Sequence, residues 1–150
     1  CGLLHDVGIA ATLIALAESS AKAPPDLVAI WPAVERVHPR AAQKMAQLWG
    51  LPADIGLAIG AHHQVKIEGY PHPLAATVCV ADQLAHERGL GLAPTGGEAE
   101  SLEQTCMASH FAIDQSGPTT LAVAREALRL TDKQLALIAR DAEQLDALAE

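Results

Sequence analysis

The chain has 150 residues, half of them hydrophobic, with 10 basic and 18 acidic side chains and a formal net charge of −8. A chain of this length is expected to form a single domain, 1–150, with a substantial core. The negative charge argues against a nucleic-acid binder and against a protein drawn to anionic membranes. No apolar run is long enough to cross a bilayer, and no signal peptide is recognisable at the start.

The cysteines indicate a reducing compartment. Cys1, Cys79 and Cys106 are odd in number and lack the paired spacing of a metal-binding Cys motif. We interpret them as reduced thiols of a cytoplasmic protein. The chain begins at Cys1 inside an apolar phrase and without a Met, which indicates that an N-terminal portion is missing ahead of it.

The composition favours an all-α fold. Ala and Leu dominate the hydrophobic residues and favour helices, whereas aromatic residues make up only 3% and β-branched runs are scarce. Apolar periodicity and helix breakers together predict about seven to eight helices of ordinary length. The expected helices are 3–20, 26–37, 38–49, 52–63, 74–88, 101–111, 119–130 and 131–148.

Prolines and glycines mark the expected boundaries. Pro32 makes the second helix short or broken, and Pro39 lies in the first turn of the third, where a proline is tolerated. Gly8, inside the first helix, indicates close packing against a neighbour. Between the helices, 64–73 is expected to be a loop and 89–100 a flexible surface connection.

One helix start has a recognisable capping pattern. Thr131 and Gln134 have the spacing of a capping box, in which each side chain satisfies a backbone N–H near the other residue. The last helix is therefore expected to begin at this point, where the preceding helix over 119–130 ends.

Histidine and aspartate residues recur within apolar stretches that are expected to be helical. Imidazole and carboxylate groups are ligands for borderline and hard divalent metals. On an apolar helix face such groups are costly unless they pair or bind something. The residues are His5 and Asp6, His38, His62 and His63, and Asp82.

Asp82 shares one helical face with apolar residues. Leu74, Val78, Asp82 and Ala85 fall at i, i+4, i+8 and i+11, so the carboxylate lies on an apolar stripe. A metal, a His or an Arg could compensate its charge. The local alternative is a pair with His86, one turn further on.

His62 and His63 extend the apolar stripe of Ile55 and Ile59. Adjacent helical residues lie roughly 100° apart, so both rings can border one cavity without stacking. The alternative is one buried, hydrogen-bonded His and one solvated His at the helix end.

The remaining candidates lie earlier in the chain. Asp6 could bridge two metals while His5 binds one, or the two could form a hydrogen bond within the core. His38 could be only a helix cap. The other histidines are expected to be surface or supporting residues: His72, His86 and His110.

The order His-Asp, His, His-His, Asp resembles that of the HD superfamily of metal-dependent phosphohydrolases, helical bundles with an inward cluster of His and Asp. Within it the likeness is greatest to the HDOD family, whose domains are signalling output modules of bacteria. It covers residues 1–90 and, more loosely, 119–150. The phrases that carry it are Gly-Leu-Leu-His-Asp-Val-Gly at 2–8, His-Pro-Arg-Ala-Ala at 38–42, Leu-Trp-Gly-Leu-Pro at 48–52, Ala-Ile-Gly-Ala-His-His at 58–63 and Leu-Ala-Ala-Thr-Val-Cys-Val-Ala-Asp-Gln-Leu-Ala at 74–85.

The resemblance implies a divalent metal, one of Fe, Mn, Ni or Zn. A second related family is HD-GYP, whose members are phosphodiesterases of cyclic di-GMP. By resemblance to it, Asp6 of this chain would bridge two metals and be the catalytic carboxylate. One metal would be held by His38, His62 and His63, and the other by His5 and Asp82. This chain also has Gly69-Tyr70-Pro71 after the paired His.

Two departures from the HD-GYP pattern argue against efficient catalysis. Ile9 stands where that family has a Lys, and an apolar side chain cannot replace a cation that contacts phosphate. Gln64 stands where it has an acidic residue. The resemblance therefore implies metal binding with weak or absent turnover.

The sequence supports three hypotheses about function. The first is an HDOD-type regulatory module that acts through signalling protein partners. The second is a metal-dependent phosphohydrolase acting on a cyclic dinucleotide or another phosphoester. The third is a helical scaffold whose polar cluster is only a hydrogen-bond network. Exposed Leu and Ala on the C-terminal helices would also suit a homodimer.

Overall fold

The computed structural model describes residues 1–19, 26–91 and 120–149, which hold six helices and one two-stranded hairpin. The all-α prediction is therefore confirmed at the level of class. The expected helix 101–111, most of the connection 89–100, Cys106 and His110 lie outside the described residues. In chain order the elements are α1 (Val7–Ser19), α2 (Leu27–Leu48), α3 (Ala53–Gly60), β1 (Lys66–Ile67), β2 (Tyr70–Pro71), α4 (Pro73–His86), α6 (Thr120–Ala127) and α7 (Asp132–Ala149).

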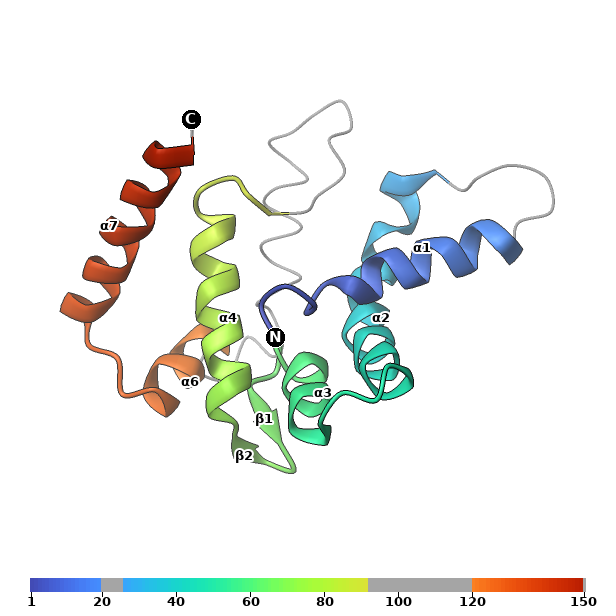
Figure 1. The fold of residues 1–150 in the computed structure, drawn as a ribbon, viewed down its shortest axis with the longest axis horizontal. Coiled ribbons are helices and arrows are strands. Elements are labelled where there is room, and N and C mark those ends of the chain that lie inside the picture. Colours follow the sequence, from blue (N-terminus) through green and yellow to red (C-terminus); the bar gives the residue numbers. More distant parts are fainter. Residues whose placement is uncertain (20–25, 92–119, 150) are drawn as a thin grey trace.

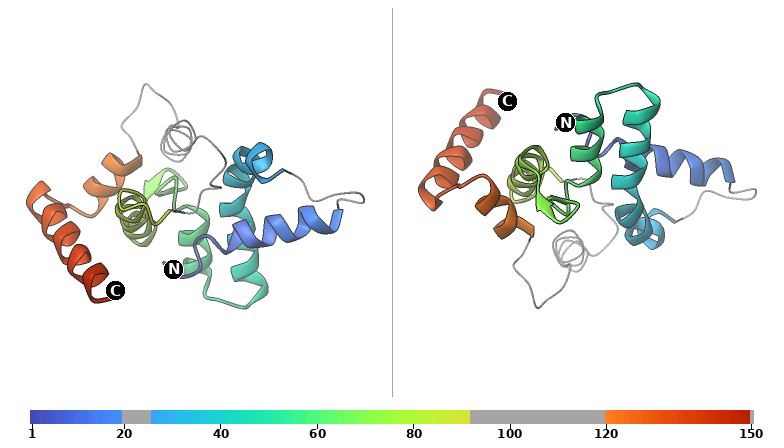
Figure 2. Two further views of the ribbon diagram at one scale, coloured as in Figure 1. Left: turned by 90° about the horizontal axis from the view of Figure 1, so that it is seen from above. Right: turned by 90° about the horizontal axis from the view of Figure 1, so that it is seen from below.

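Helix α4 occupies the middle of the molecule. Helices α1, α2 and α3 lie on one side of it, and α6 and α7 lie on the other (Figure 1). Views from above and below show the same division (Figure 2). In the described part of the chain, no helix has the length and apolar character needed to span a membrane.

Helix α2 corrects a prediction, because one continuous helix replaces the two expected over 26–37 and 38–49. Pro32 and Pro39 both lie inside it, and each removes a helical hydrogen bond at a cost of roughly 3 kcal/mol. Both rings lie off the buried side of the helix, whose stripe continues past them and offsets that cost. The buried stripe consists of Trp31, Val34, His38, Ala42 and Ala46.

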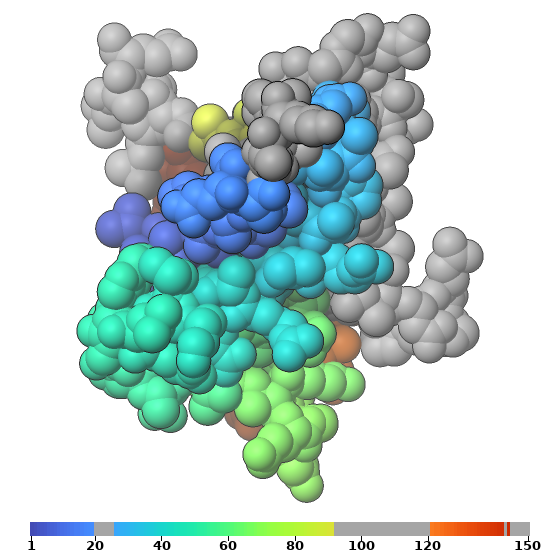
Figure 3. All heavy atoms as spheres, turned by 90° about the vertical axis from the view of Figure 1, so that its right-hand side faces the viewer, coloured from blue at the N-terminus to red at the C-terminus, as the bar shows by residue number. Residues whose placement is uncertain are grey.

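Helices α1 and α2 meet at Gly8, as the sequence predicted for a glycine kept inside a helix. A Cβ at Gly8 would overlap the carbonyl oxygen of His38 and the amide nitrogen of Ala42. Next to it, Ile9 packs against Trp31 in one of the small core clusters. The two helices lie directly against each other on this side of the molecule (Figure 3). This contact brings the start of α1 close to the middle of α2.

Four of the candidate residues lie in turns, although the sequence predicted helix for all of them. His5 and Asp6 precede α1, which begins at Val7, and His62 and His63 follow α3, which ends at Gly60. The turn after α3 is closed by the amide of Val65, which donates to Ala61 O at 2.7 Å. Val65 itself has φ of 61°, a conformation incompatible with a continuing helix.

The expected loop 64–73 contains a short antiparallel hairpin, in which Lys66 pairs with Pro71 and Ile67 with Tyr70. His72 then caps α4, its side chain accepting the amide of Ala75 at 3.4 Å. The hairpin thus leads from the paired histidines directly into the helix that carries Asp82.

The predicted capping box is confirmed at the start of α7. The amide of Thr131 donates to Gln134 Oε1 at 2.9 Å, and the amide of Gln134 donates to Thr131 Oγ1 at 3.3 Å. Each side chain satisfies an N–H group that the helix leaves without an internal partner.

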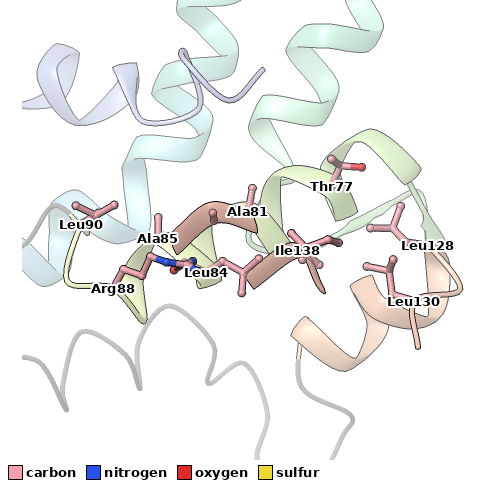
Figure 4. Close-up of a pocket in the computed structure, with 11 residues that line it drawn as sticks. Thr77, Ala81, Leu84, Ala85, Arg88, Leu90, Leu128, Leu130 and Ile138 are labelled. Atoms are coloured by element: carbon pink, nitrogen blue, oxygen red, sulfur yellow. Dashed lines mark hydrogen bonds between the residues drawn. The ribbon is translucent and has the colours of Figure 1, made fainter. Parts of the chain in front are cut away.

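The side of α4 toward α7 borders a cavity of about 530 Å³ (Figure 4). Arg88, in the turn after α4, spans the gap by donating to the carbonyl of Ala139 in α7. Most of the lining is apolar: Thr77, Val80, Ala81, Leu84, Ala85, Arg88, Leu90, Leu128, Leu130, Ile138 and Ala142.

Candidate metal centre

The structure brings all six sequence-predicted site residues together. They come from the turn before α1, the middle of α2, the turn after α3, and α4. Their nitrogen and oxygen atoms form two groups, and within each group one ligand atom per residue lies within 4.8 Å of the others. The first group is His38, His62 and His63, and the second is His5, Asp6 and Asp82.

The first group is a convergence of three imidazoles. His38 Nε2 lies 3.4 Å from His62 Nε2 and 3.1 Å from His63 Nε2. Nitrogen ligands at about 2.1 Å from one ion lie about 3.0 to 3.4 Å apart for octahedral to tetrahedral angles. The two distances from His38 therefore fit nitrogen ligands that share one divalent ion.

Asp6 connects the two groups through its two oxygens. Oδ1 lies 3.3 Å from His38 Nε2 and 3.8 Å from His62 Nε2, both in the first group. Oδ2 lies 3.2 Å from His5 Nε2 in the second group. One carboxylate is thus placed to serve both groups, as the sequence-based hypothesis of a bridging Asp6 requires.

Asp82 completes the second group from α4. Its Oδ1 lies 3.5 Å from His5 Nε2 and 3.6 Å from His86 Nε2. The sequence offered a metal and His86 as alternative partners for this carboxylate, and both arrangements are compatible with its position. The sequence predicts a surface or supporting role for His86, and its i+4 spacing from Asp82 already indicates this contact.

Backbone carbonyls fix the orientation of two of the rings. His5 Nδ1 donates to Gly2 O at 2.7 Å, and His62 Nδ1 donates to Ile59 O at 2.5 Å. A carbonyl can only accept, so Nδ1 carries the proton in both rings and each neutral ring presents a lone pair at Nε2. This is the usual outer contact of a metal-binding histidine.

The carboxylates of the cluster remain ionised. Burial opposes the charge of Asp6, but hydrogen bonding to His38 and His5 outweighs it and holds the pKa of Asp6 far below its usual range. For Asp82, burial again opposes the charge, and His5 and His86 lower its pKa. Both are therefore charged ligands at neutral pH.

The pKa values of His62 and His5 are shifted in opposite directions. Burial lowers the pKa of His62 to about 4, and the charges of neighbouring rings add to that shift. Burial also acts on His5, but the carboxylates of Asp6 and Asp82 outweigh it and raise the pKa to about 10. At neutral pH His62 is therefore uncharged and ready to bind a metal. His5 is protonated and has to release a proton before its Nε2 can bind one.

The cluster is buried on one side and accessible on the other. The side chains of His38 and His62 have no exposed surface, whereas those of His5 and Asp6 are 18% and 25% exposed. His63 and Asp82 are also only partly buried, so an ion or a small ligand can reach the cluster past its partly exposed members.

Comparison of the chain with protein-family models, with curated proteins and with solved structures gives no match. The site is therefore interpreted from its own geometry and chemistry.

Proposed function

We propose that this protein is a divalent-metal-binding regulatory module of the HDOD type, whose output is contact with signalling partner proteins. The observation that carries the metal-binding part is the position of Asp6, with one oxygen 3.3 Å from His38 Nε2 and the other 3.2 Å from His5 Nε2. A carboxylate between two ligand groups is the arrangement expected of a dinuclear centre.

The donor set supports borderline divalent ions. The first group supplies three imidazole nitrogens, and the second supplies one imidazole and two carboxylates. Mixed nitrogen and oxygen ligands of this kind suit Fe, Mn, Ni or Zn, and supply in the cell commonly decides among them.

Regulation is favoured over turnover by the residues beside the cluster. Ile9 is only 8% exposed and packs against Trp31 and Val34 in the α1–α2 core, so position 9 offers no cation to a phosphate. Gln64, which follows the paired histidines, is exposed and uncharged. A centre with these neighbours is better suited to stabilising a conformation than to cleaving a phosphoester.

A metal-dependent phosphohydrolase is the second candidate, favoured by the same central position of Asp6. Metals held by the two groups would lower the pKa of a water molecule and neutralise phosphate charge. Four members of the cluster, His5, Asp6, His63 and Asp82, are only partly buried, so a phosphoester such as a cyclic dinucleotide could reach them.

Metal content tests the proposal directly. The protein is purified without chelator and analysed by plasma mass spectrometry beside Asp6→Asn and His62→Ala. We expect about two equivalents of metal per chain in the parent protein and at most about one in each variant. Asp54→Asn is the matched control, because Asp54 is an exposed carboxylate in the first turn of α3. Absence of metal from the parent protein would refute the proposal.

Hydrolysis of cyclic di-GMP separates the two candidates. The regulatory module predicts no turnover with added Mn²⁺, Fe²⁺ or Zn²⁺. Turnover that requires the metal and disappears in Asp6→Asn, but not in Asp54→Asn, would establish the phosphohydrolase instead.

A further inference from the structure

His86 lies beside the cluster but outside its two ligand groups. It follows Asp82 by one turn of α4, and its Nε2 lies 3.6 Å from Asp82 Oδ1. The same oxygen lies 3.5 Å from His5 Nε2. The Asp82 carboxylate is therefore held between an imidazole of the second ligand group and an imidazole that belongs to neither group.

The chain after α4 turns back over this ring. The amide of Gly89 donates to His86 O at 2.9 Å, and the amide of Leu90 donates to Ala85 O at 3.0 Å. With Gly89 at φ of 72°, these two bonds form a Schellman motif. Such a C-terminal cap fixes the path of the next residue, which is Gly91.

Gly91 packs directly on the imidazole of His86. A Cβ at Gly91 would overlap Nδ1 and Cε1 of that ring. The ring is thus confined between the backbone of Gly91 and the carboxylate of Asp82, and its side chain is only 14% exposed. Any larger residue at position 91 has to displace the ring from this place.

We propose that His86 is a positioning residue of the metal centre: confined by Gly91, it fixes the orientation of the Asp82 carboxylate toward the second ligand group. This inference rests on the proposed metal-binding function. A carboxylate rotates easily about its terminal torsion, and one fixed contact on an oxygen limits that rotation. Outer contacts of this kind typically change metal affinity by about 10- to 100-fold.

The distinction between the two ligand groups makes the inference specific. His86 contacts Asp82, which belongs only to the second group, and has no place among His38, His62 and His63. Loss of His86 should therefore lower the affinity for one of the two bound ions, whereas a general loss of packing would lower the affinity for both.

The test is a Mn²⁺ titration of the full chain, with free Mn²⁺ measured by electron paramagnetic resonance. The parent protein should bind two ions, and His86→Ala should weaken one of them by about 10- to 100-fold while leaving the other unchanged. His86→Gln should restore most of the lost affinity, because its amide N–H can still reach the Asp82 carboxylate.

Gly91→Ala reaches the same contact without removing the ring. Like His86→Ala, it should lower the affinity for one of the two Mn²⁺ ions, because the new methyl group displaces the His86 ring. Gly56→Ala is the matched control, since a Cβ there makes only ordinary contacts, the nearest at 3.7 Å to Ala46 Cβ. Thermal unfolding of each variant checks that the fold is retained.

Two results would overturn the inference, and they are distinguishable from each other. A parent protein that binds no Mn²⁺, Fe²⁺ or Zn²⁺ removes both the inference and the proposed function. A parent protein that binds two ions, together with His86→Ala and Gly91→Ala variants that bind both equally well, removes the positioning role alone.

Discussion

The two sides of α4 differ in how tightly they are built. Toward α1, α2 and α3, Asp82 joins a cluster whose polar atoms lie about 3 to 4 Å from their neighbours, and backbone carbonyls orient two of its rings. Toward α7, apolar side chains such as Leu84 and Ile138 line a cavity of about 530 Å³. Helix α4 thus separates a polar cluster with specific close contacts from an apolar cavity that side chains fill only in part.

This difference has an energetic basis. A polar group buried without a partner costs about 1 to 3 kcal/mol, so a substitution that separates the polar atoms of the cluster should lower the stability of the fold. Apolar contacts are individually weak and non-directional, so a gap between α4 and α7 loses only part of the packing energy. Substitutions near the cluster should therefore have larger effects than substitutions around the cavity.

Gly8→Ala should have the largest effect, because it places a methyl group on the backbone of α2. Overpacking against atoms that cannot move costs about 1 to 3 kcal/mol and should move Asp6 away from His38. Urea unfolding should show the loss of stability, and metal analysis should show at most one equivalent. Gly56→Ala, with ordinary contacts around its new methyl group, should match the parent protein in both measurements.

A second prediction concerns the pH dependence of the metal-free protein. The pKa of His5 is raised from 6.5 to about 10, so its ion pairs stabilise the fold fully below pH 6.5. That stabilisation should be lost as pH rises toward 10. Urea unfolding in chelator should show this decline in the parent protein, and His5→Gln should flatten it.

The control for His5→Gln is His72→Asn, since asparagine can still cap α4. This variant should keep the alkaline decline of the parent protein. A decline of equal size in His5→Gln would contradict the ion pairing of His5 with Asp6 and Asp82.

The smallest expected effect is on the other side of α4. Ala142 of α7 lines the cavity, and Ala142→Leu should fill part of it and stabilise the protein by about 1 kcal/mol. Thermal unfolding measures the gain, and metal content should stay unchanged. A large loss of bound metal in this variant would show that the two sides of α4 are coupled.

The sequence located the six candidate residues because His and Asp on apolar stretches need compensation, and their order supplied the hypothesis that they act together. Its prediction of helix is right for His38 and Asp82 and wrong for the other four. His62 and His63 lie in a turn, where backbone geometry sets their directions, so a helical rule for adjacent residues does not apply.

Helix α2 shows why local rules failed elsewhere. Pro32 and Pro39 predicted a break, but a buried stripe that runs from Trp31 to Ala46 favours one continuous helix. Gly8 was correctly identified as a packing position, whereas the partner that it contacts could not be derived from spacing. The contact of Gly91 with His86 depends on the path of the chain after α4, which the sequence pattern did not specify.

The most direct test of the central claim is the spectrum of the protein loaded with two Mn²⁺ ions. Because the oxygens of Asp6 reach both ligand groups, we predict an exchange-coupled pair in the electron paramagnetic resonance spectrum, lost in Asp6→Asn. Two independent Mn²⁺ signals, or no bound Mn²⁺, Fe²⁺ or Zn²⁺ at all, would contradict a dinuclear centre joined by Asp6.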